Sequence, residues 1–307
     1  MTAPPAAAPL VSIITATYNR SNVLRYTLRS VLRSTFDDWE HVVVGDGCTD
    51  DTAEVVAGLS DARLRFCNLP ANFGEQSYPN NKGFELARGR YIAYLNHDDL
   101  WFPDHLDTVL RGMRETGADL VYTPILALAP DRCNYLLGAL PGERYDPIVA
   151  VPASSWLVRR ELVAELGGWR PYHECYTYPS HDFLWRAWRA GKDVRMVPRV
   201  TVIAILSGVR QQVYATREFH EHQACFERMA SEPEFREREL MHVAVAYAAR
   251  AVPRSRVPPL RWLRAGVRRV LTALDVPPAG LRLWLRYRGK GGLIHDLRKR
   301  RGLSRLK

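Results

Sequence analysis

The chain of 307 residues has few cysteines and no long hydrophobic run. Its five cysteines are odd in number, lie far apart and form no CxxC pair, which excludes a disulfide framework and a cysteine-rich zinc site. The longest apolar stretch, around residues 200–206, is too short to span a bilayer. Residues 1–9 lack the basic flank and apolar segment of a signal peptide and are expected to be disordered. These absences predict a cytoplasmic protein, either soluble or peripheral on the inner face of the cell membrane.

Positive charge is scarce in most of the chain and concentrated at one end. The whole chain has a net charge of +10, whereas residues 254–307 hold sixteen Lys and Arg against two Asp, a balance of +14. The first 253 residues therefore carry −4. This asymmetry predicts a mildly acidic body and a strongly basic tail whose partner is an anionic surface.

The tail, residues 253–307, begins with a proline-rich break at 253–259. Apolar residues recur at helical spacing over 260–274 with arginines on the flanks, and residues 281–287 mix Trp and Tyr with arginine. This pattern is suited to the interface of an anionic membrane. An amphipathic helix packed on the body, with its arginines in water, fits the pattern almost equally well. Nucleic acid is not an expected partner, because no binding motif is recognisable.

The body of the chain alternates between strand and helix patterns. Buried-strand patterns at residues 11–17, 39–44, 64–68 and 91–95 are separated by segments whose apolar residues keep helical spacing. This order predicts an α/β fold with a parallel sheet and right-handed crossovers. A helical extension is expected over residues 206–252.

The stretch most indicative of chemistry runs from residue 91 to residue 103. Its first five residues are apolar, aromatic and β-branched, as in a strand buried on both faces, and Asn96-His97-Asp98-Asp99 follows directly. Ligands of open α/β sheets bind at the carboxyl ends of the strands. Adjacent carboxylates repel each other, so they need a cation, a hydrogen-bond network or water. We interpret the stretch as a metal-centred site; a solvated turn with a helix cap is the alternative.

A second segment comes close to a dinucleotide-binding fingerprint. Gly45 and Gly47 have the spacing of its first two glycines, but Asp50 occupies the position of the third. A carboxylate there would repel a pyrophosphate. The sequence therefore excludes a Rossmann-type dehydrogenase.

Three segments together resemble the bacterial-type family 2 glycosyltransferases of the GT-A fold: residues 12–20, 42–52 and 91–103. The resemblance covers roughly residues 10–205 and implies a catalytic domain with a Rossmann-like, mostly parallel sheet flanked by helices. It also implies an inverting transfer of a sugar from a nucleoside diphosphate sugar, a UDP-sugar first of all, with Mg²⁺ or Mn²⁺. The implied acceptor is a glycan or a lipid-linked molecule of cell-surface polysaccharide biosynthesis.

The resemblance assigns donor-side roles position by position. Thr15, Tyr18 and Arg20 would line the nucleotide pocket, and Asp46 would face the nucleobase. Asp98 matches the last acid of the metal-binding DxD motif and would be the metal ligand.

Three features depart from the family pattern on this donor side. The usual Asp-Asp-Gly after the second strand is Gly45-Asp46-Gly47 here. The first acid of the DxD motif is Asn96, which we still expect beside the nucleotide sugar. The Arg-Asn pair often found before the central strand is Asn80-Asn81 here, and Asn81 takes the place of its second member. The missing arginine removes one charge contact to the diphosphate.

Asp182 matches the family's catalytic base, at the start of a predicted helix. A sugar hydroxyl is a poor nucleophile until a base accepts its proton, so the proposed reaction needs such a group. The alternative is that Asp182 only stabilises the positive N-terminal end of its helix.

Candidates for the acceptor side are Trp101, Ser155 and His181. Ser155 lies in a segment that resembles the family's acceptor-side strand, and Trp101 has an aromatic face suited to stacking on a sugar. His220 and His222 are the nearest candidates for a further metal ligand. We leave them out of the site, because residues 216–230 have the pattern of a solvated helix.

Two hypotheses remain from the sequence. The first is a metal-dependent inverting glycosyltransferase in which Asp98 holds the cation and Asp182 is the base. The second is a non-catalytic scaffold or binding protein on a decayed transferase fold, using its basic tail; the replacement of the first DxD acid by Asn96 favours it. Retention of both Asp98 and Asp182 favours the enzyme.

Overall fold

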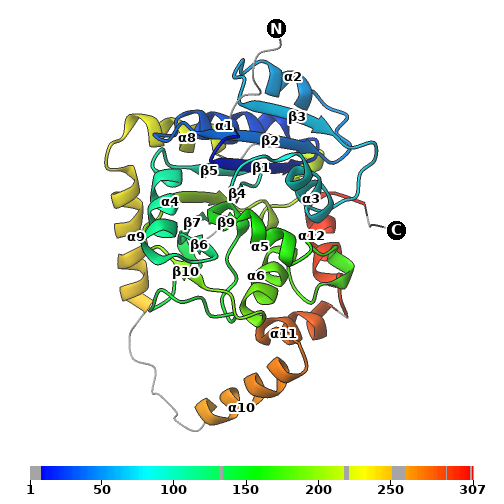
Figure 1. Cartoon of the computed structure of the whole chain (residues 1–307), viewed down its shortest axis with the longest axis vertical. Coiled ribbons are helices and arrows are strands. Elements are labelled where there is room, and N and C mark those ends of the chain that lie inside the picture. Colours follow the sequence, from blue (N-terminus) through cyan, green and yellow to red (C-terminus); the bar gives the residue numbers. More distant parts are fainter. Residues whose placement is uncertain are drawn as a thin grey trace.

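The computed structural model describes residues 8–130, 134–217, 221–250, 260–287, 289–304 and 306. Its centre is a seven-stranded sheet in the order β10-β6-β9-β4-β1-β2-β3 (Figure 1). Neighbouring strands are parallel except at β9, which runs antiparallel to both β4 and β6. The predicted α/β fold with a mostly parallel sheet is therefore confirmed. The strands are β1 (Val11–Thr17), β2 (Trp39–Gly45), β3 (Leu64–Asn68), β4 (Tyr91–Tyr94), β6 (Leu120–Tyr122), β9 (Trp156–Arg159) and β10 (Val194–Met196).

A second sheet, which the sequence did not predict, has the order β5-β11-β7-β8. Its strands are β5 (Asp99–Trp101), β7 (Ile125–Leu128), β8 (Tyr135–Leu137) and β11 (Val202–Ile205). In this sheet Asp99 is paired with Ala204 in an antiparallel register. The segment after β4 therefore leads from one sheet into the other, and its last carboxyl residue is fixed in a strand.

Amphipathic helices bury their apolar faces against these sheets. Leu24 and Leu28 of α1 pack with Val43 of β2, as the helical spacing after residue 21 predicts. Leu106 of α4 packs in one cluster with Leu157 of the central sheet, so α4 contributes to the main core. The helices of the body are α1 (Ser21–Leu32), α2 (Thr52–Ala57), α3 (Ser77–Leu86), α4 (His105–Thr116), α5 (Arg160–Glu165) and α6 (Pro179–Arg189).

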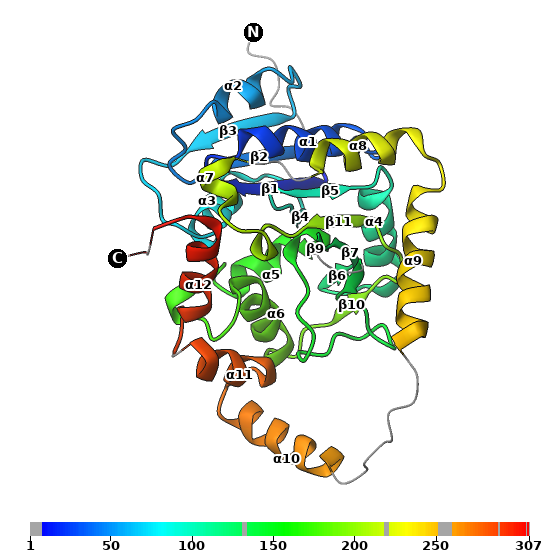
Figure 2. The same ribbon diagram turned by 180° about the vertical axis from the view of Figure 1, so that it is seen from behind.

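Within the described ranges, six further α-helices follow the second sheet, which confirms the predicted helical C-terminal region. They are α7 (Val213–Thr216), α8 (His222–Ser231), α9 (Phe235–Arg250), α10 (Leu260–Ala273), α11 (Pro278–Tyr287) and α12 (Gly292–Arg301). Figures 1 and 2 show α9 along one side of the sheets and α12 on the opposite side, with α10 farthest from the core. Within the described ranges, no helix is both long and apolar enough to cross a bilayer.

Some sequence predictions fall on residues outside these ranges. Residues 1–7 of the N-terminal segment, residues 253–259 of the proline-rich break, and His220 lie there.

Candidate active site

A cavity of about 550 Å³ lies where three neighbouring strands of the central sheet end. Tyr18 comes from the end of β1, Asp46 follows β2, and residues 96–99 follow β4; all of them line this cavity. The start of α6 and much of α12 form other parts of its wall. The polar groups that the sequence places after these strands therefore meet in one cavity at the carboxyl edge of the sheet.

Asp98 is the charged carboxylate of the motif after β4. Burial alone would raise its pKa, but the charges of His97 and Arg301 outweigh burial and hold the pKa below its usual range. The backbone carbonyl of Asp98 lies 3.1 Å from Nε2 of His222, whose side chain is buried. The sequence pattern set His222 aside as part of a solvated helix, whereas the structure places it against the motif.

Asp99 behaves differently from its neighbour. Burial, followed by the negative charge of Asp98, raises the pKa of Asp99 to about 8. Its carboxyl group contacts Oγ of Ser154 and accepts a hydrogen bond of 2.9 Å from Nδ2 of Asn96. The repulsion between adjacent acids is therefore relieved by a hydrogen-bond network and a proton on Asp99, and Asp98 alone carries charge at neutral pH.

The donor atoms around Asp98 suit a cation shared with a phosphate ligand. Among the residues that the structure describes, no three His, Cys, Asp or Glu side chains converge as a complete metal cage. Mg²⁺ in nucleotide sites is commonly held by one or two carboxylates together with phosphate oxygens and water. One ionised carboxylate at the wall of a cavity fits that arrangement, and the amide of Asn96 is already bonded to Asp99.

Tyr18 and Asp46 line the cavity at the positions that the family resemblance assigned to the nucleotide. The Tyr18 ring stacks on that of Tyr214, with centroids 6.5 Å apart. Both carboxylate oxygens of Asp46 accept backbone hydrogen bonds, from Phe73 at 2.9 Å and from Gly74 at 2.8 Å. Asp46 therefore also fixes the loop that closes this side of the cavity.

Two other residues assigned to the nucleotide pocket do not reach the cavity. Thr15 is completely buried two residues inside the end of β1, and its hydroxyl lies 2.8 Å from Nε2 of His41. Arg20 is also completely buried, and its guanidinium donates to the carbonyl of Val213 and lies 5.2 Å from the ring of Tyr214. Both side chains are enclosed by protein and do not line this cavity, so their assignment to the nucleotide pocket stays a prediction.

Asn81 does not reach the cavity either. Its Nδ2 donates to the carbonyl of Trp169 at 2.9 Å, and its Oδ1 accepts from the backbone N–H of Trp169 at 2.8 Å. This pair of hydrogen bonds joins α3 to the loop after α5. The expected contact of Asn81 with the nucleotide sugar is therefore replaced by a structural role.

The three residues predicted for the acceptor side are buried and bonded to backbone carbonyls. Nε1 of Trp101 donates to the carbonyl of residue 154 at 2.6 Å, and Oγ of Ser155 donates to that of residue 152 at 3.1 Å. Nε2 of His181 lies 2.9 Å from the carbonyl of residue 147. None of the three lines the cavity. Their assignment to the acceptor side therefore gains no support from the cavity and stays a prediction.

Asp182 lies in the first turn of α6, as predicted, and is buried. Its Oδ2 pairs with Nε of Arg186 at 2.8 Å, and its Oδ1 lies 3.9 Å from Nη1 of Arg170. Arg186 also donates to two backbone carbonyls before α6. Pro179 and Ser180 line the cavity, whereas Asp182, two residues farther along the helix, does not.

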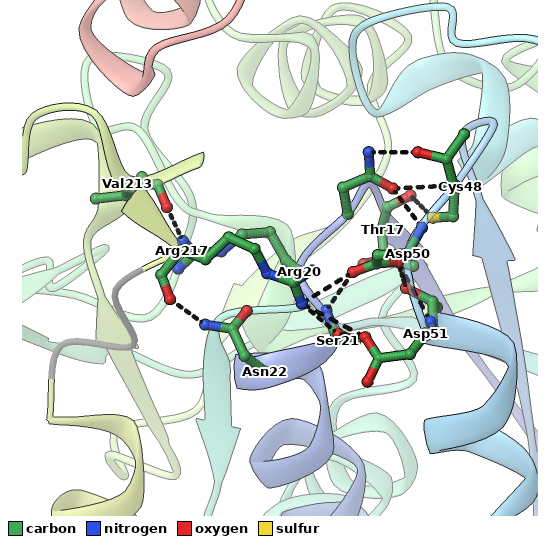
Figure 3. Close-up of polar contacts among 12 residues, drawn as sticks. Thr17, Arg20, Ser21, Asn22, Cys48, Asp50, Asp51, Val213 and Arg217 are labelled. Atoms are coloured by element: carbon green, nitrogen blue, oxygen red, sulfur yellow. Dashed lines mark hydrogen bonds and ion pairs between the residues drawn. The ribbon is translucent and has the colours of Figure 1, made fainter. Parts of the chain in front are cut away.

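The segment around α7 covers the edge of the site and is tied to the body by a polar network (Figure 3). Arg217 pairs with Asp50 at 3.2 Å and donates to Oγ of Ser21 at 2.6 Å. The carbonyl of Arg217 accepts from Nδ2 of Asn22 at 2.6 Å. Within the covered region, the hydroxyl of Tyr214 lies 3.2 Å from Nε2 of His97. Contacts almost 200 residues apart along the chain thus hold α7 beside the strand ends.

Glu75 is a cavity residue that sequence reasoning missed. Burial raises its pKa to about 7, and its Oε2 accepts hydrogen bonds of 2.7 Å from both the backbone N–H and the hydroxyl of Ser77. No motif marks this residue; its position on the loop before α3 could not be inferred from the strand patterns.

Glu75 predicts a pH-dependent contribution to stability. Unfolded Glu has a pKa near 4.3, so between about pH 4.5 and 7 the folded state retains a proton that the unfolded chain has released. Stability should fall as pH rises through this window, and Glu75→Gln should remove that loss, which is on the order of 1–3 kcal/mol. Urea unfolding of both proteins at pH 4.5, 6 and 8 measures it. A stability difference that is constant across the three pH values would contradict the assignment.

The fold and the cavity define an α/β protein with a ligand site at the carboxyl edge of a mostly parallel sheet. Comparison with known proteins places it more narrowly: residues 12–137 match the Glycosyl transferase family 2 model. This match over residues 12–137 confirms the family resemblance seen in the three motifs.

Curated relatives agree with this family. The chain is 35% identical over 148 residues to the putative teichuronic acid biosynthesis glycosyltransferase TuaG of Bacillus subtilis, covering 48% of this chain and 54% of TuaG. It is 31% identical over 113 residues to the Escherichia coli UDP-Glc:alpha-D-GlcNAc-diphosphoundecaprenol beta-1,3-glucosyltransferase WfgD, covering 37% of this chain and 44% of WfgD. The chain thus spans about half the length of these relatives.

Solved structures show the same GT-A fold. Staphylococcus aureus TarS 1-349 in complex with UDP-GlcNAc superposes with a TM-score of 0.56 at 16% identity, over 76% of this chain and 70% of that one. The mannosyltransferase PcManGT from Pyrobaculum calidifontis, in complex with GDP-Man and Mn²⁺, gives 0.54 at 16% identity, over 95% and 88%. At such identities the likeness establishes the fold alone.

Proposed function

We propose that this chain is an inverting glycosyltransferase that transfers a sugar from a nucleoside diphosphate sugar to a glycan or lipid-linked acceptor of cell-surface polysaccharide biosynthesis. The family 2 domain supports the reaction type, and relatives named for teichuronic acid biosynthesis and for a diphosphoundecaprenol acceptor support the pathway class. The observation that carries the proposal is Asp98, an ionised carboxylate on the wall of a cavity at the strand ends. We place the catalytic domain at residues 10–205 and a helical extension at 206–252.

On the donor side, Asp98 would hold Mg²⁺ or Mn²⁺ together with the diphosphate. Such a cation, when bound, neutralises the negative charge that develops on the leaving nucleoside diphosphate. The chain's own contribution is to keep Asp98 ionised, which it does with the positive charge of Arg301, and to keep Asp99 neutral by burial. Tyr18 and Asp46 line the part of the cavity that we assign to the nucleoside.

On the acceptor side, we propose Asp182 as the base that accepts the hydroxyl proton. The carboxylate is bonded to Arg186, and the start of its helix lines the cavity. Arg186 would orient the carboxylate, since two backbone carbonyls fix the guanidinium. A positioned base of this kind contributes roughly 10²–10⁴-fold in rate.

A panel of nucleotide sugars tests the proposed function. The full chain is incubated with UDP-, GDP- and dTDP-sugars and Mn²⁺ or Mg²⁺, and release of the nucleoside diphosphate is measured. We expect slow hydrolysis of one donor and an increase in thermal unfolding temperature with the same donor. A chain that neither binds nor hydrolyses any donor would support the non-catalytic scaffold instead.

We also propose that helices α10 and α11 dock the enzyme on the inner face of an anionic membrane. Val267 and Val270 of α10 and Leu274 directly after it are 48–66% exposed, and Leu285 of α11 is 64% exposed. Arginines flank these apolar residues along both helices. Apolar side chains beside basic ones suit a helix that lies in a headgroup region, and each basic residue near such a surface contributes about 1 kcal/mol.

Vesicle flotation measures this docking. The double variant Val270→Glu, Leu274→Glu should bind vesicles containing phosphatidylglycerol at least about tenfold less than the unmodified chain, because it adds two negative charges to the docking face. Met241→Glu, Val245→Glu is the matched control, since these residues are similarly exposed on α9. Binding by the unmodified chain should weaken with salt. Equal loss in both double variants, or binding to neutral vesicles as strong as to anionic ones, would refute the proposal.

A further inference from the structure

The last helix of the chain, α12, forms a wall of the candidate donor cavity. Figures 1 and 2 show it on the side of the sheets where α3 lies, next to α6. Its position is fixed from several directions: the carbonyl of Arg300 accepts from the backbone of Gln212 at 2.7 Å, and Arg298 donates to the carbonyl of Gly74. The ring of His295 packs edge-on against Tyr172 at 5.3 Å. The helix therefore bridges the loop before α3 and the segment that carries α7.

This helix supplies the positive charge of the cavity. Within the described ranges, every Lys or Arg that lines the cavity belongs to α12, namely Arg298, Arg300 and Arg301. The body contributes carboxyl groups instead, of which Asp98 is ionised. Without α12 the cavity would present an acidic surface, which repels a nucleoside diphosphate. An anionic ligand therefore requires this helix, whatever cation Asp98 also holds.

The three arginines are not equally engaged with the protein. Arg298 donates to the carbonyls of residues 74 and 304, and Arg300 pairs with Asp296 at 2.8 Å. Nε of Arg301 is buried and has no hydrogen-bond partner among the described residues. Arg301 lines the same cavity as Asp98, the proposed metal ligand. A buried guanidinium N–H without an acceptor indicates a position where a ligand oxygen would accept a hydrogen bond.

We propose that α12 is the cationic wall of the donor site and that Arg301, assisted by Arg300, binds the diphosphate of the nucleotide sugar. A guanidinium donates paired N–H groups whose geometry matches phosphate oxygens. The inference rests on the proposed function and assigns the donor's diphosphate to a segment outside residues 12–137, the part that matches the family.

The test is calorimetric titration of the full chain with UDP and with GDP, each with Mn²⁺. Arg301→Gln should raise the Kd of the nucleotide that the unmodified chain binds by about tenfold or more, since it removes a charge-assisted hydrogen bond. Arg301→Lys should recover part of that loss, because the charge remains and the paired donors do not. Lys299→Gln is the matched control: it lies on the same helix, is exposed and does not line the cavity. Its Kd should equal that of the unmodified chain.

Several outcomes separate this inference from the proposed function. Unchanged affinity in both Arg301→Gln and Arg300→Gln would overturn the inference alone, whereas failure of the unmodified chain to bind UDP, GDP or any other nucleoside diphosphate would overturn both. Tighter binding by Arg301→Gln would also overturn the inference, because α12 would then be a cover that competes with the ligand. Thermal unfolding of each variant identifies a loss of fold. If Arg301→Gln is unstable, the Kd of Arg300→Gln tests the inference instead, because the Arg300 side chain is half solvent-exposed in its ion pair.

Discussion

Replacing Asp98 by alanine is expected to abolish the metal-dependent part of nucleoside diphosphate binding. Of the two adjacent acids after β4, Asp98 alone is ionised at neutral pH, because burial and the charge of its neighbour keep a proton on Asp99. The neighbouring carboxyl of Asp99 is therefore a poor substitute ligand for the cation. We expect the affinity measured with Mn²⁺ to fall by more than about 100-fold, toward the value measured with EDTA.

Asp99→Asn is the matched control for this experiment. An amide has nearly the shape of the protonated carboxyl group and retains hydrogen-bonding capacity toward Ser154. It should therefore leave Mn²⁺-dependent binding within a fewfold of the unmodified chain. Were Asp98→Ala to keep its Mn²⁺ dependence, or were Asp99→Asn to lose it equally, the assignment of the cation to Asp98 would be wrong.

Replacing Asp182 by asparagine is expected to reduce turnover by roughly 10²–10⁴-fold while nucleotide affinity stays nearly constant. Asparagine keeps the size of the side chain but cannot accept the proton of a sugar hydroxyl. The measurement is the rate of sugar transfer under saturating donor and acceptor, together with the Kd of the nucleoside diphosphate. Turnover above about a tenth of the original value would exclude Asp182 as the base.

A purely structural role for Asp182 gives a different result. Asp182 forms an ion pair with Arg186 that joins α6 to the loop after α5. If that pair is all Asp182 provides, Asp182→Asn and Arg186→Gln should lower the unfolding temperature alike, and activity should fall only with the folded fraction. A base predicts that Asp182→Asn remains folded at the assay temperature and is inactive there.

The sequence predicted the parts of the fold that depend on local patterns. Strands such as residues 11–17 and 91–94 are mostly apolar and buried along nearly their whole length, and strands of this kind lie in the middle of a parallel sheet. Since parallel strands end at one edge, the polar groups after them had to meet there, and Tyr18, Asp46 and Asp98 do so. Strand order and the short strands of the second sheet could not be predicted, because three or four residues carry too little periodicity.

At the site, the direction in which each side chain points was the feature that the sequence could not predict. Thr15, Trp101 and His181 belong to segments that border the cavity, yet each is bonded inside the protein. His222 shows the opposite error: its helix has a mostly polar pattern, but one side chain on it is 1% exposed and touches the motif. The spacing of apolar residues along the sequence indicates how many residues of a segment face the core. Which of its side chains contact a ligand depends on tertiary packing.

The basic tail was ambiguous for a physical reason. Apolar residues and arginines at helical spacing suit a helix on a membrane and a helix packed against protein, because both present one apolar face and one charged face. In the structure, Val270 of α10 and the following Leu274 are exposed, while α12 buries Leu293 and lines the cavity. No sequence signal indicated that Arg301 lies close enough to Asp98 to affect its pKa.

The place of α12 also has a consequence for the order in which the protein becomes competent during synthesis. A ribosome delivers Asp46 and Asp98 more than 200 residues before it delivers Arg300 and Arg301. The sheets and the acidic half of the cavity are therefore complete in a nascent chain that still lacks every described cationic residue of the cavity wall. If the arginines of α12 bind the diphosphate, such a chain folds its core but does not bind a nucleotide sugar. Donor binding then begins only after α12 has been synthesised and has packed against the loop at Gly74.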